Sequence, residues 1–248
     1  MNAKLYVIPG SHPCRTGMLL LEHKNVPYES IELVPGVHPV AVRLLGFPGK
    51  TRRSHQLGDG RHPGLSIADR LGTVPALRYD GQRIQTCREI ARFLDRVEPD
   101  PPLFPADPVR RRAVEEAELW GDDVLQMAAR RLVLAAGRRG RLSDDGDDGR
   151  MGPLLYKTRR VRSRAMPILA YAFEVGNRVE RELLEELPSM LDRVDAWIEA
   201  GVLNGEWLNA ADYMIVSSIA LLTYCADLAP QIAARPAGAL VDRVLPNP

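Results

Sequence analysis

The stretch LGTVPALRYDGQ, residues 71–82, contains the strongest short hairpin signal in the chain. Two strand-like segments, PALRYD and QRIQ, flank the dipeptide Asp80-Gly81, which favours the tight turn of an antiparallel hairpin. The next segment, REIARFLDRV at residues 88–97, has apolar residues at helical spacing. Pro75 lacks the N–H that a sheet ladder requires, so it does not belong inside a central strand unless it has a specific role there.

Upstream of the hairpin, the sequence predicts a strand, a helix and a second strand. KLYVI at residues 4–8 is apolar and β-rich, PCRTGMLLLEHKN at 13–25 has helical spacing after a proline, and YESIELV at 28–34 alternates like a strand. The order β-α-β, a long connection and β-β-α predicts an α/β thioredoxin-like domain over residues 1–97.

Downstream of residue 97 the composition changes. EPDPPLFPADP is acidic and crowded with prolines, which stop helices, and we expect a linker over residues 98–107. Beyond it, helical patterns predict an all-α domain over residues 108–248. The predicted helices cover 108–137, about 157–175, 178–200, 210–228 and 236–244.

Two segments have the character of insertions. Residues 51–72 lengthen the connection before the hairpin, and we interpret them as an added flap. The charged, glycine-rich sequence within residues 140–152 predicts a mobile loop, and its acidic run does not have calcium-loop spacing. The basic cluster KTRRVRSR at 157–164 is interpreted as an exposed helix face rather than an anion site.

Composition limits the function classes. The chain has 248 residues, 45% of them hydrophobic, with 33 Lys and Arg against 32 Asp and Glu. This balance argues against a protein built to bind nucleic acid or a membrane surface. Without an apolar span or a secretory signal, we expect a cytoplasmic protein. The three cysteines are widely separated, so they predict neither a disulfide framework nor a metal site; Cys225 is expected to be a buried hydrophobe.

Four stretches resemble the glutathione S-transferase superfamily. They are residues 4–29 (KLYVIPGSHPCRTGMLLLEHKNVPYE), TVPAL at 73–77, REIARFLD at 88–95 and LNGEWLNAADYMIVSSIALL at 203–222. The resemblance implies a thioredoxin-like domain followed by an all-α domain, and a homodimer. It also implies glutathione or another low-molecular-weight thiol as cosubstrate, with no metal.

The resemblance implies a role for Pro75. In this superfamily the bond that precedes the corresponding proline is cis, and cis bonds occur almost only before proline. The backbone N–H and C=O of Val74 would then face the site and pair with the cysteinyl part of the thiol. The alternative is a trans proline at the first residue of a strand.

Ser11 is the candidate catalytic residue, because it matches the serine of serine-type members of the superfamily. The thiolate is the nucleophile, and a donor hydroxyl at a helix N-terminus raises its population. The alternative is a helix N-cap, and the two roles are compatible. Cys14 is the runner-up: SHPC has the CxxC frame without its first cysteine, so Cys14 is either a lone thiolate or a buried helix residue. His12 is a candidate anion or substrate contact, and its alternative is an exposed loop histidine.

Thr86 and Cys87 depart from the family pattern. They stand where the superfamily usually has Glu or Gln followed by Ser, the pair that holds the γ-glutamyl carboxylate of glutathione. Thr86 can still cap the following helix and offer a hydroxyl there, whereas Cys87 replaces serine poorly. The glutathione site is therefore expected to be atypical, and a different thiol stays possible.

In the second half, Asn209 and Asp212 fit the capping box of a core helix. The family's electrophile pocket lies between the domains, along the first long helix of the second one. The sequence does not indicate which face of that helix turns inward, although Trp120 is expected in the core. The residues on or near it are Glu118, Trp120, Asp122, Leu125 and Gln126.

The resulting prediction is a transferase that activates a low-molecular-weight thiol for attack on a small hydrophobic electrophile. Three alternatives stay open: a non-catalytic binding or assembly module of the same fold, a thiol-dependent isomerase, and a thiol-disulfide enzyme based on Cys14.

Overall fold

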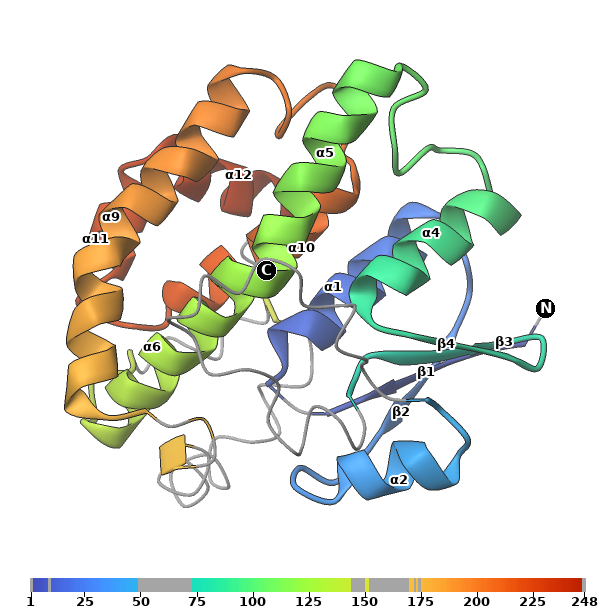
Figure 1. The fold of residues 1–248 in the computed structure, drawn as a ribbon, viewed down its shortest axis with the longest axis horizontal. Helices are drawn as coiled ribbons and strands as arrows, with labels where there is room; N and C mark the ends of the chain where they lie inside the picture. Colours follow the sequence, from blue (N-terminus) through green and yellow to red (C-terminus); the bar gives the residue numbers. More distant parts are fainter. Residues whose placement is uncertain are drawn as a thin grey trace.

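A computed structural model describes residues 2–8, 10–48, 73–143, 150–151, 170–171, 173 and 175–246 (Figure 1). The predicted flap at 51–72, most of the predicted helix at 157–175 and the basic cluster at 157–164 lie outside the described residues.

The first half forms a four-stranded sheet of the order β2-β1-β3-β4. Its strands are β1 (Ala3–Val7), β2 (Glu29–Glu32), β3 (Ala76–Tyr79) and β4 (Gln82–Gln85). β1 is parallel to β2 and antiparallel to β3, which pairs with β4 through the predicted turn, where Asp80 and Gly81 have φ of 44° and 87°.

Within the described residues, three helices accompany the sheet. α1 (His12–His23) and α4 (Cys87–Val97) lie together on one side of it, and α2 (His38–Leu44) lies on the other (Figure 1). The predicted α/β thioredoxin-like class is confirmed, although α2 was not predicted. Val40 and Leu44 of α2 are exposed, so this helix lacks the apolar face that makes a helix visible in a sequence.

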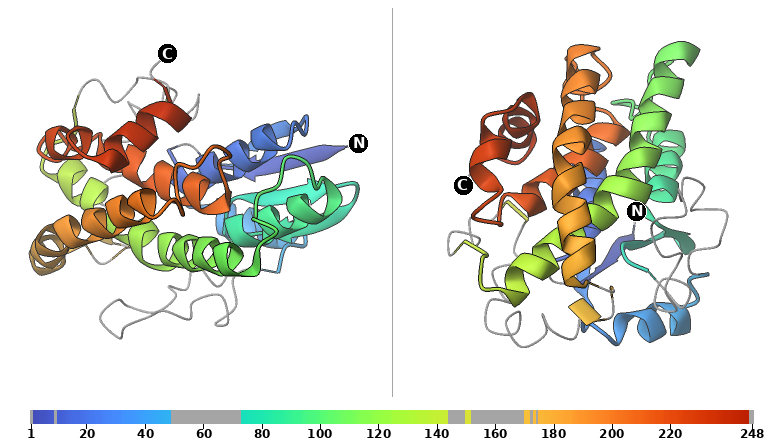
Figure 2. Two further views of the ribbon diagram at one scale, coloured as in Figure 1. Left: turned by 90° about the horizontal axis from the view of Figure 1, so that it is seen from above. Right: turned by 60° about the vertical axis from the view of Figure 1, so that its left-hand side comes forward.

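The second half is helical. Its described residues form α5 (Pro108–Trp120), α6 (Gln126–Arg138), α9 (Asn177–Glu199), α10 (Ala210–Leu222), α11 (Ala229–Ala233) and α12 (Pro236–Val244). A π-helical turn, η2 (Gly121–Leu125), joins α5 to α6 and makes the predicted helix at 108–137 continuous. Figure 2 shows α9 and α5 side by side, and α11 and α12, which lie behind α9 in Figure 1, to one side of it.

α10 is the centre of this half. All 13 of its residues are buried, and the capping box of Asn209 and Asp212 that the sequence predicted begins it. The helix ends at Leu222, six residues before the predicted end, and the unpredicted α11 follows. The predicted helices at 178–200 and 236–244 correspond to α9 and α12.

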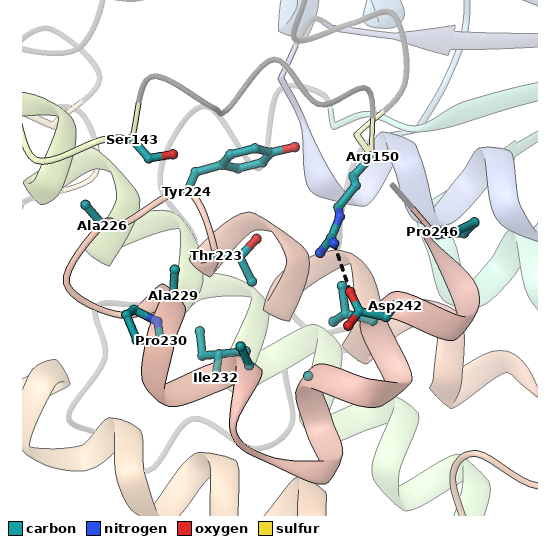
Figure 3. Close-up of a pocket in the computed structure, with 13 residues that line it drawn as sticks. Ser143, Arg150, Thr223, Tyr224, Ala226, Ala229, Pro230, Ile232, Asp242 and Pro246 are labelled. Atoms are coloured by element: carbon teal, nitrogen blue, oxygen red, sulfur yellow. Dashed lines mark hydrogen bonds and ion pairs between the residues drawn. The ribbon is translucent and has the colours of Figure 1, made fainter. Parts of the chain in front are cut away.

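The segment predicted to be a mobile loop, residues 140–152, is anchored at both described ends. Leu142 forms a β-bridge with the buried Cys225. Met151 is buried, and Arg150 forms an ion pair with Asp242 of α12 at 2.8 Å (Figure 3). The charge-rich sequence conceals these anchors, because Met151 is a single apolar residue without periodic neighbours.

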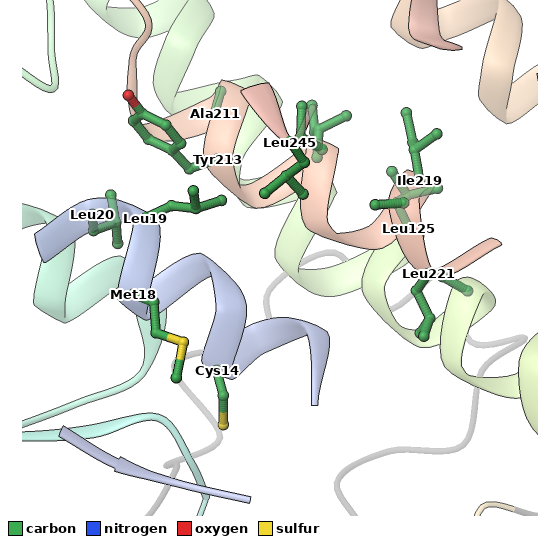
Figure 4. Close-up of a cluster of buried hydrophobic side chains, with 14 of the residues drawn as sticks. Cys14, Met18, Leu19, Leu20, Leu125, Ala211, Tyr213, Ile219, Leu221 and Leu245 are labelled. Atoms are coloured by element: carbon green, nitrogen blue, oxygen red, sulfur yellow. The ribbon is translucent and has the colours of Figure 1, made fainter. Parts of the chain in front are cut away.

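α1 and α10 form the main contact between the two halves. Leu19 of α1 lies beside Tyr213 of α10 at this contact (Figure 4), and the Thr16 hydroxyl donates to the Tyr213 carbonyl at 3.3 Å. α1 therefore packs on the sheet with one face and on the all-α half with another. Among the helices of the described ranges, none has the length and apolar character needed to cross a bilayer.

Candidate functional site

The N-terminus of α1 is capped by Ser11. This residue has extended backbone angles, and its Oγ accepts a hydrogen bond from the Cys14 N–H at 3.4 Å. The predicted N-cap is therefore present. No acidic residue occupies the first turn, so the positive end of the helix is left without a neutralising carboxylate of its own turn.

Pro75 lies directly against α1. The Val74–Pro75 peptide bond is cis, as the resemblance implied. A Cβ added to Gly17 would lie 3.0 Å from the Pro75 Cβ, so only glycine lets the helix approach this closely. Val74 precedes β3 and lies outside the ladder that pairs Ala76 with Tyr6 and Gln85, so the sheet does not use its backbone N–H and C=O.

α4 begins at the same place. Thr86 caps it, with Oγ1 accepting from the Glu89 N–H at 3.3 Å, while the Thr86 N–H donates to the Pro75 carbonyl at 3.3 Å. Thr86 has a φ of 76°, a left-handed conformation that is uncommon for a β-branched residue. The start of α4 is thus tied to Pro75, and through Pro75 to α1.

Cys87 is buried, and its Sγ donates to the Pro13 carbonyl at 3.2 Å. This contact joins the first turn of α4 to the first turn of α1. The Cys87 side chain is therefore directed into the protein. The predicted contact of Cys87 with a bound thiol stays a prediction.

His12 is not an exposed loop residue, so that expectation was wrong. It is the first residue of α1, only 2% exposed, and its Nε2 lies 3.1 Å from the Gln126 carbonyl oxygen of α6. Burial, reinforced by the charge of Arg130, holds the pKa of His12 well below its ordinary value. The ring connects the two halves, and the lowered pKa disfavours the imidazolium form. The predicted contact of His12 with an anion or substrate stays a prediction.

Cys14 is fully buried, which raises the pKa of its thiol to about 11. The Ser11 side chain, a backbone hydrogen bond at Ile8 and the charge of Arg130 favour the thiolate, but burial outweighs them. Cys14 is therefore a neutral thiol at physiological pH, which disfavours the thiol-disulfide alternative.

Arg130 was missed by the sequence analysis. It lies on α6 with its guanidinium carbon 4.9 Å from the centre of the Phe173 ring, a cation–π contact, and its charge acts on both His12 and Cys14. It adds positive potential near the start of α1. The run AARR gave no signal for this role, because the start of α6 comes near α1 only through the contact between His12 and Gln126, which are 114 residues apart.

The five residues singled out on or near the first long helix turn largely inward. Trp120 is in the core, as predicted, with its ring 5.3 Å from that of Trp197. Glu118 is fully buried and pairs with Arg92 at 2.8 Å and Arg88 at 3.5 Å, both on α4. These carboxylate–guanidinium contacts hold the two halves together. Asp122, Leu125 and Gln126 are also buried.

Within the described ranges, no group of three or more His, Cys, Asp or Glu side chains is arranged to hold a metal ion.

No protein-family model matches the chain, and no curated protein matches it in sequence. Solved structures do match over nearly the whole length. FzlA from C. crescentus is 15% identical with a TM-score of 0.62, covering 98% of this chain and 88% of its own. A glutathione S-transferase from Rhodospirillum rubrum F11 is 17% identical with a TM-score of 0.60, covering 99% of this chain and 89% of its own.

A third match is a glutathione S-transferase of Ceriporiopsis subvermispora in complex with glutathione. It is 18% identical with a TM-score of 0.62, and the match covers 98% of this chain and 96% of that one. Identities this low establish the fold and leave the activity open. The chain therefore has the glutathione S-transferase fold, a thioredoxin-like domain followed by an all-α domain.

Proposed function

We propose that this protein is a thiol transferase that adds glutathione, or another low-molecular-weight thiol, to a small hydrophobic electrophile. The observation that carries the proposal is the meeting of α1, Pro75 and α4 at one point. Ser11 caps the first helix there, Gly17 packs on Pro75, and Thr86 caps the second helix. Two helix N-termini directed at one place favour a bound anion such as a thiolate.

Ser11 would act on the sulfur of the bound thiol. Its oxygen accepts a hydrogen bond from the Cys14 N–H, and its own proton can be donated to the thiolate. The thiol loses its proton to solvent, and the sulfur uses the freed electron pair to form a bond with the electrophilic carbon. In a substitution, the leaving group departs with the electron pair of the bond that breaks. In an addition, the electron pair displaced from the electrophile's bond takes a proton from water. Stabilising the thiolate raises the reactive fraction at neutral pH.

The rest of the thiol would be held by backbone groups. The N–H and C=O of Val74 are suited to pairing with the cysteinyl part, and the start of α4 at Thr86 and Cys87 is suited to a carboxylate. We further propose that the protein is a homodimer, as the superfamily resemblance implies, and that it is cytoplasmic, as expected from its sequence.

Ser11→Ala tests the proposal. Removing one donor aimed at a reacting anion typically lowers kcat by about 100- to 1,000-fold. We expect a loss of this size in kcat/KM for several thiols against a panel of electrophiles. Ser11→Thr should retain activity. Ser189→Ala, a change at an exposed serine of α9, is the matched control. Unchanged rates with Ser11→Ala would remove the assignment.

A second candidate, a non-catalytic binding module, is favoured by one observation. Cys87 is buried where the superfamily places a serine at the carboxylate of glutathione, so one expected side-chain contact is missing. Calorimetric titration with glutathione separates the two candidates: micromolar to millimolar binding supports the transferase, and no binding supports the module or another thiol. Alkylation of Cys14 tests the thiol-disulfide alternative, because activity that survives it excludes that chemistry.

A further inference from the structure

Three cationic side chains lie side by side across the sheet. Lys4 of β1 is directly opposite Arg78 of β3, and Arg78 is directly opposite Arg83 of β4. Side chains of directly opposite residues share one face of a sheet, and neighbouring strands are about 4.8 Å apart, so the three charges form a row of about 10 Å. We call these three residues the basic row.

The basic row lies on the face of the sheet that α2 covers in part. Side chains alternate between the faces along β1, and Tyr6, two residues after the lysine of the row, has its ring 5.6 Å from that of Phe47, which follows α2. Arg83 Nε donates to the Leu45 carbonyl at 2.8 Å, so the end of α2 lies against the row. α1 and α4 lie on the other side of the sheet (Figure 1). Both arginines of the row are exposed.

The charges of the row are only partly neutralised within the protein. Lys4 pairs with Glu29 at 2.8 Å, and this contact raises the pKa of Lys4, whereas the charge of Arg78 opposes the rise. Arg78 itself has neither a hydrogen bond nor an ion pair within the described part of the chain. The carboxylate of Asp80 at the turn accepts from the Asn2 N–H at 2.8 Å. Because like charges directly opposite one another destabilise a sheet, the row does not serve the fold and is suited to a negatively charged partner.

Beside the row, α2 turns apolar side chains outward. Val40 is 52% exposed, Leu44 84% and Leu45 38%. Large apolar side chains grouped at the surface and bordered by charged ones are typical of protein interaction sites. On such a surface the apolar side chains supply affinity by leaving water, and the charges select the partner.

We propose that the basic row and the exposed end of α2 form a docking surface for an acidic peptide segment of a partner protein, one with leucine-like side chains among its carboxylates. Arg78 has five N–H donors and pairs with a carboxylate in bidentate geometry. A row of three cations suits a few carboxylates, whereas an anionic membrane recruits clusters of about four to eight. The balance of 33 basic and 32 acidic residues likewise disfavours a membrane or a nucleic acid.

The test is the fluorescence anisotropy of a labelled peptide made of alternating pairs of glutamate and leucine, titrated with the full chain. The competitors are a lysine–leucine peptide of equal length, a single-stranded DNA oligonucleotide, and vesicles of phosphatidylserine and phosphatidylcholine. The glutamate–leucine peptide is expected to bind most tightly, and its binding should weaken as salt is added.

Variants locate the peptide on the surface. Arg78→Gln should weaken its binding by about 2- to 5-fold, the usual value of an exposed ion pair, and Arg78→Glu by about 10-fold or more. Leu44→Ser should weaken it by about 10-fold, because a leucine then no longer leaves water on binding. The matched controls are Arg181→Gln, at an exposed arginine of α9, and Val109→Ser, at an exposed valine of α5, and neither should change binding.

Two further results separate the surface from misfolding and from the thiol site. Arg78→Gln removes a like-charge neighbour of Lys4 and Arg83, so its melting temperature should equal or exceed that of the wild type while its peptide binding falls. Ser11→Ala should leave peptide binding unchanged. Tighter binding of the DNA, the vesicles or the lysine–leucine peptide, or unchanged peptide binding by Arg78→Glu, overturns the proposal.

Discussion

The side-chain caps of α10 and α1 differ in how many backbone N–H groups they satisfy and in whether they carry a negative charge. At α10, Asn209 accepts from the Ala211 and Asp212 N–H groups, and Asp212 accepts in return from the N–H groups of Asn209 and Asn204. At α1, Ser11 accepts one hydrogen bond, from Cys14, and no carboxylate follows in the first turn.

The α10 cap therefore serves the structure alone, whereas the α1 cap leaves the positive end of its helix able to interact with a bound anion. The α10 cap is buried and supplies its own negative charge, so the positive end of the helix is neutralised inside the protein. The α1 cap is neutral and half-buried, and its hydroxyl hydrogen-bonds the neutral Cys14 thiol, a contact that a bound thiolate would replace. A thiolate held at α1 would supply the charge that Asp212 supplies at α10.

Asp212→Ala breaks the structural cap and has the largest expected effect. Two N–H groups lose their carboxylate acceptor, each at about 1 to 3 kcal/mol, so the free energy of unfolding should fall by about 2 to 6 kcal/mol. Urea denaturation followed by circular dichroism measures it. Glu185→Ala, at an exposed glutamate of α9, is the control and should change the free energy of unfolding by less than about 0.5 kcal/mol. An equal loss in both variants would contradict the comparison.

Ser11→Asp makes the α1 cap resemble that of α10. Aspartate caps a helix as well as serine does, so the free energy of unfolding should stay within about 1 kcal/mol of the wild type. The carboxylate cannot donate a hydrogen bond and repels a thiolate, so thiol-transfer kcat/KM should fall by about 100-fold or more. Melting curves and steady-state rates measured on one preparation test this, and a loss of stability in step with activity would refute it.

The two caps also differ in their response to pH. Burial raises the pKa of Asp212 from 3.8 to about 6. The folded protein therefore holds this proton more tightly than the unfolded chain. The extra stability of the protonated carboxyl is complete below pH 4 and is lost as the pH rises through 6, while the two hydrogen bonds that Asp212 accepts persist. Relative to Asp212→Asn, which has no titrating group there, the wild type should lose stability between pH 4 and pH 7. Urea midpoints across this range show it, and a constant difference would disprove it.

Local signals in the sequence sufficed for both caps and for the hairpin. Asp80-Gly81, Asn209 and Asp212 act on backbone groups within a few residues, so their roles are visible in a short window. The start of α1 at Ser11 was visible for the same reason. The order of the elements then followed from these caps and turns and from the apolar periodicity between them.

The site's surroundings were not visible in the sequence. His12 is buried because α6 supplies the carbonyl of Gln126, 114 residues away, and Cys87 turns inward because Pro13 lies beside it. The charge of Arg130 acts on His12 and Cys14 because the fold brings α6 near the start of α1. The position of each of these side chains depends on contacts between distant segments, which periodicity does not encode. Ser11 was therefore proposed as the catalytic residue without the nearby charge of Arg130.

Arg130→Gln tests that surrounding charge and has the smallest expected effect. The guanidinium acts through space on the start of α1, and removing it should make a bound thiolate less favourable. We expect the pH profile of kcat/KM to shift upward by about half a unit, which lowers the rate about 3-fold at neutral pH. Arg130→Lys keeps the charge and should keep the profile, whereas Arg181→Gln, an exposed arginine of α9, controls for net charge. Because a merely structural arginine would change rates without moving the profile, an unshifted profile would show that α1 alone supplies the positive potential.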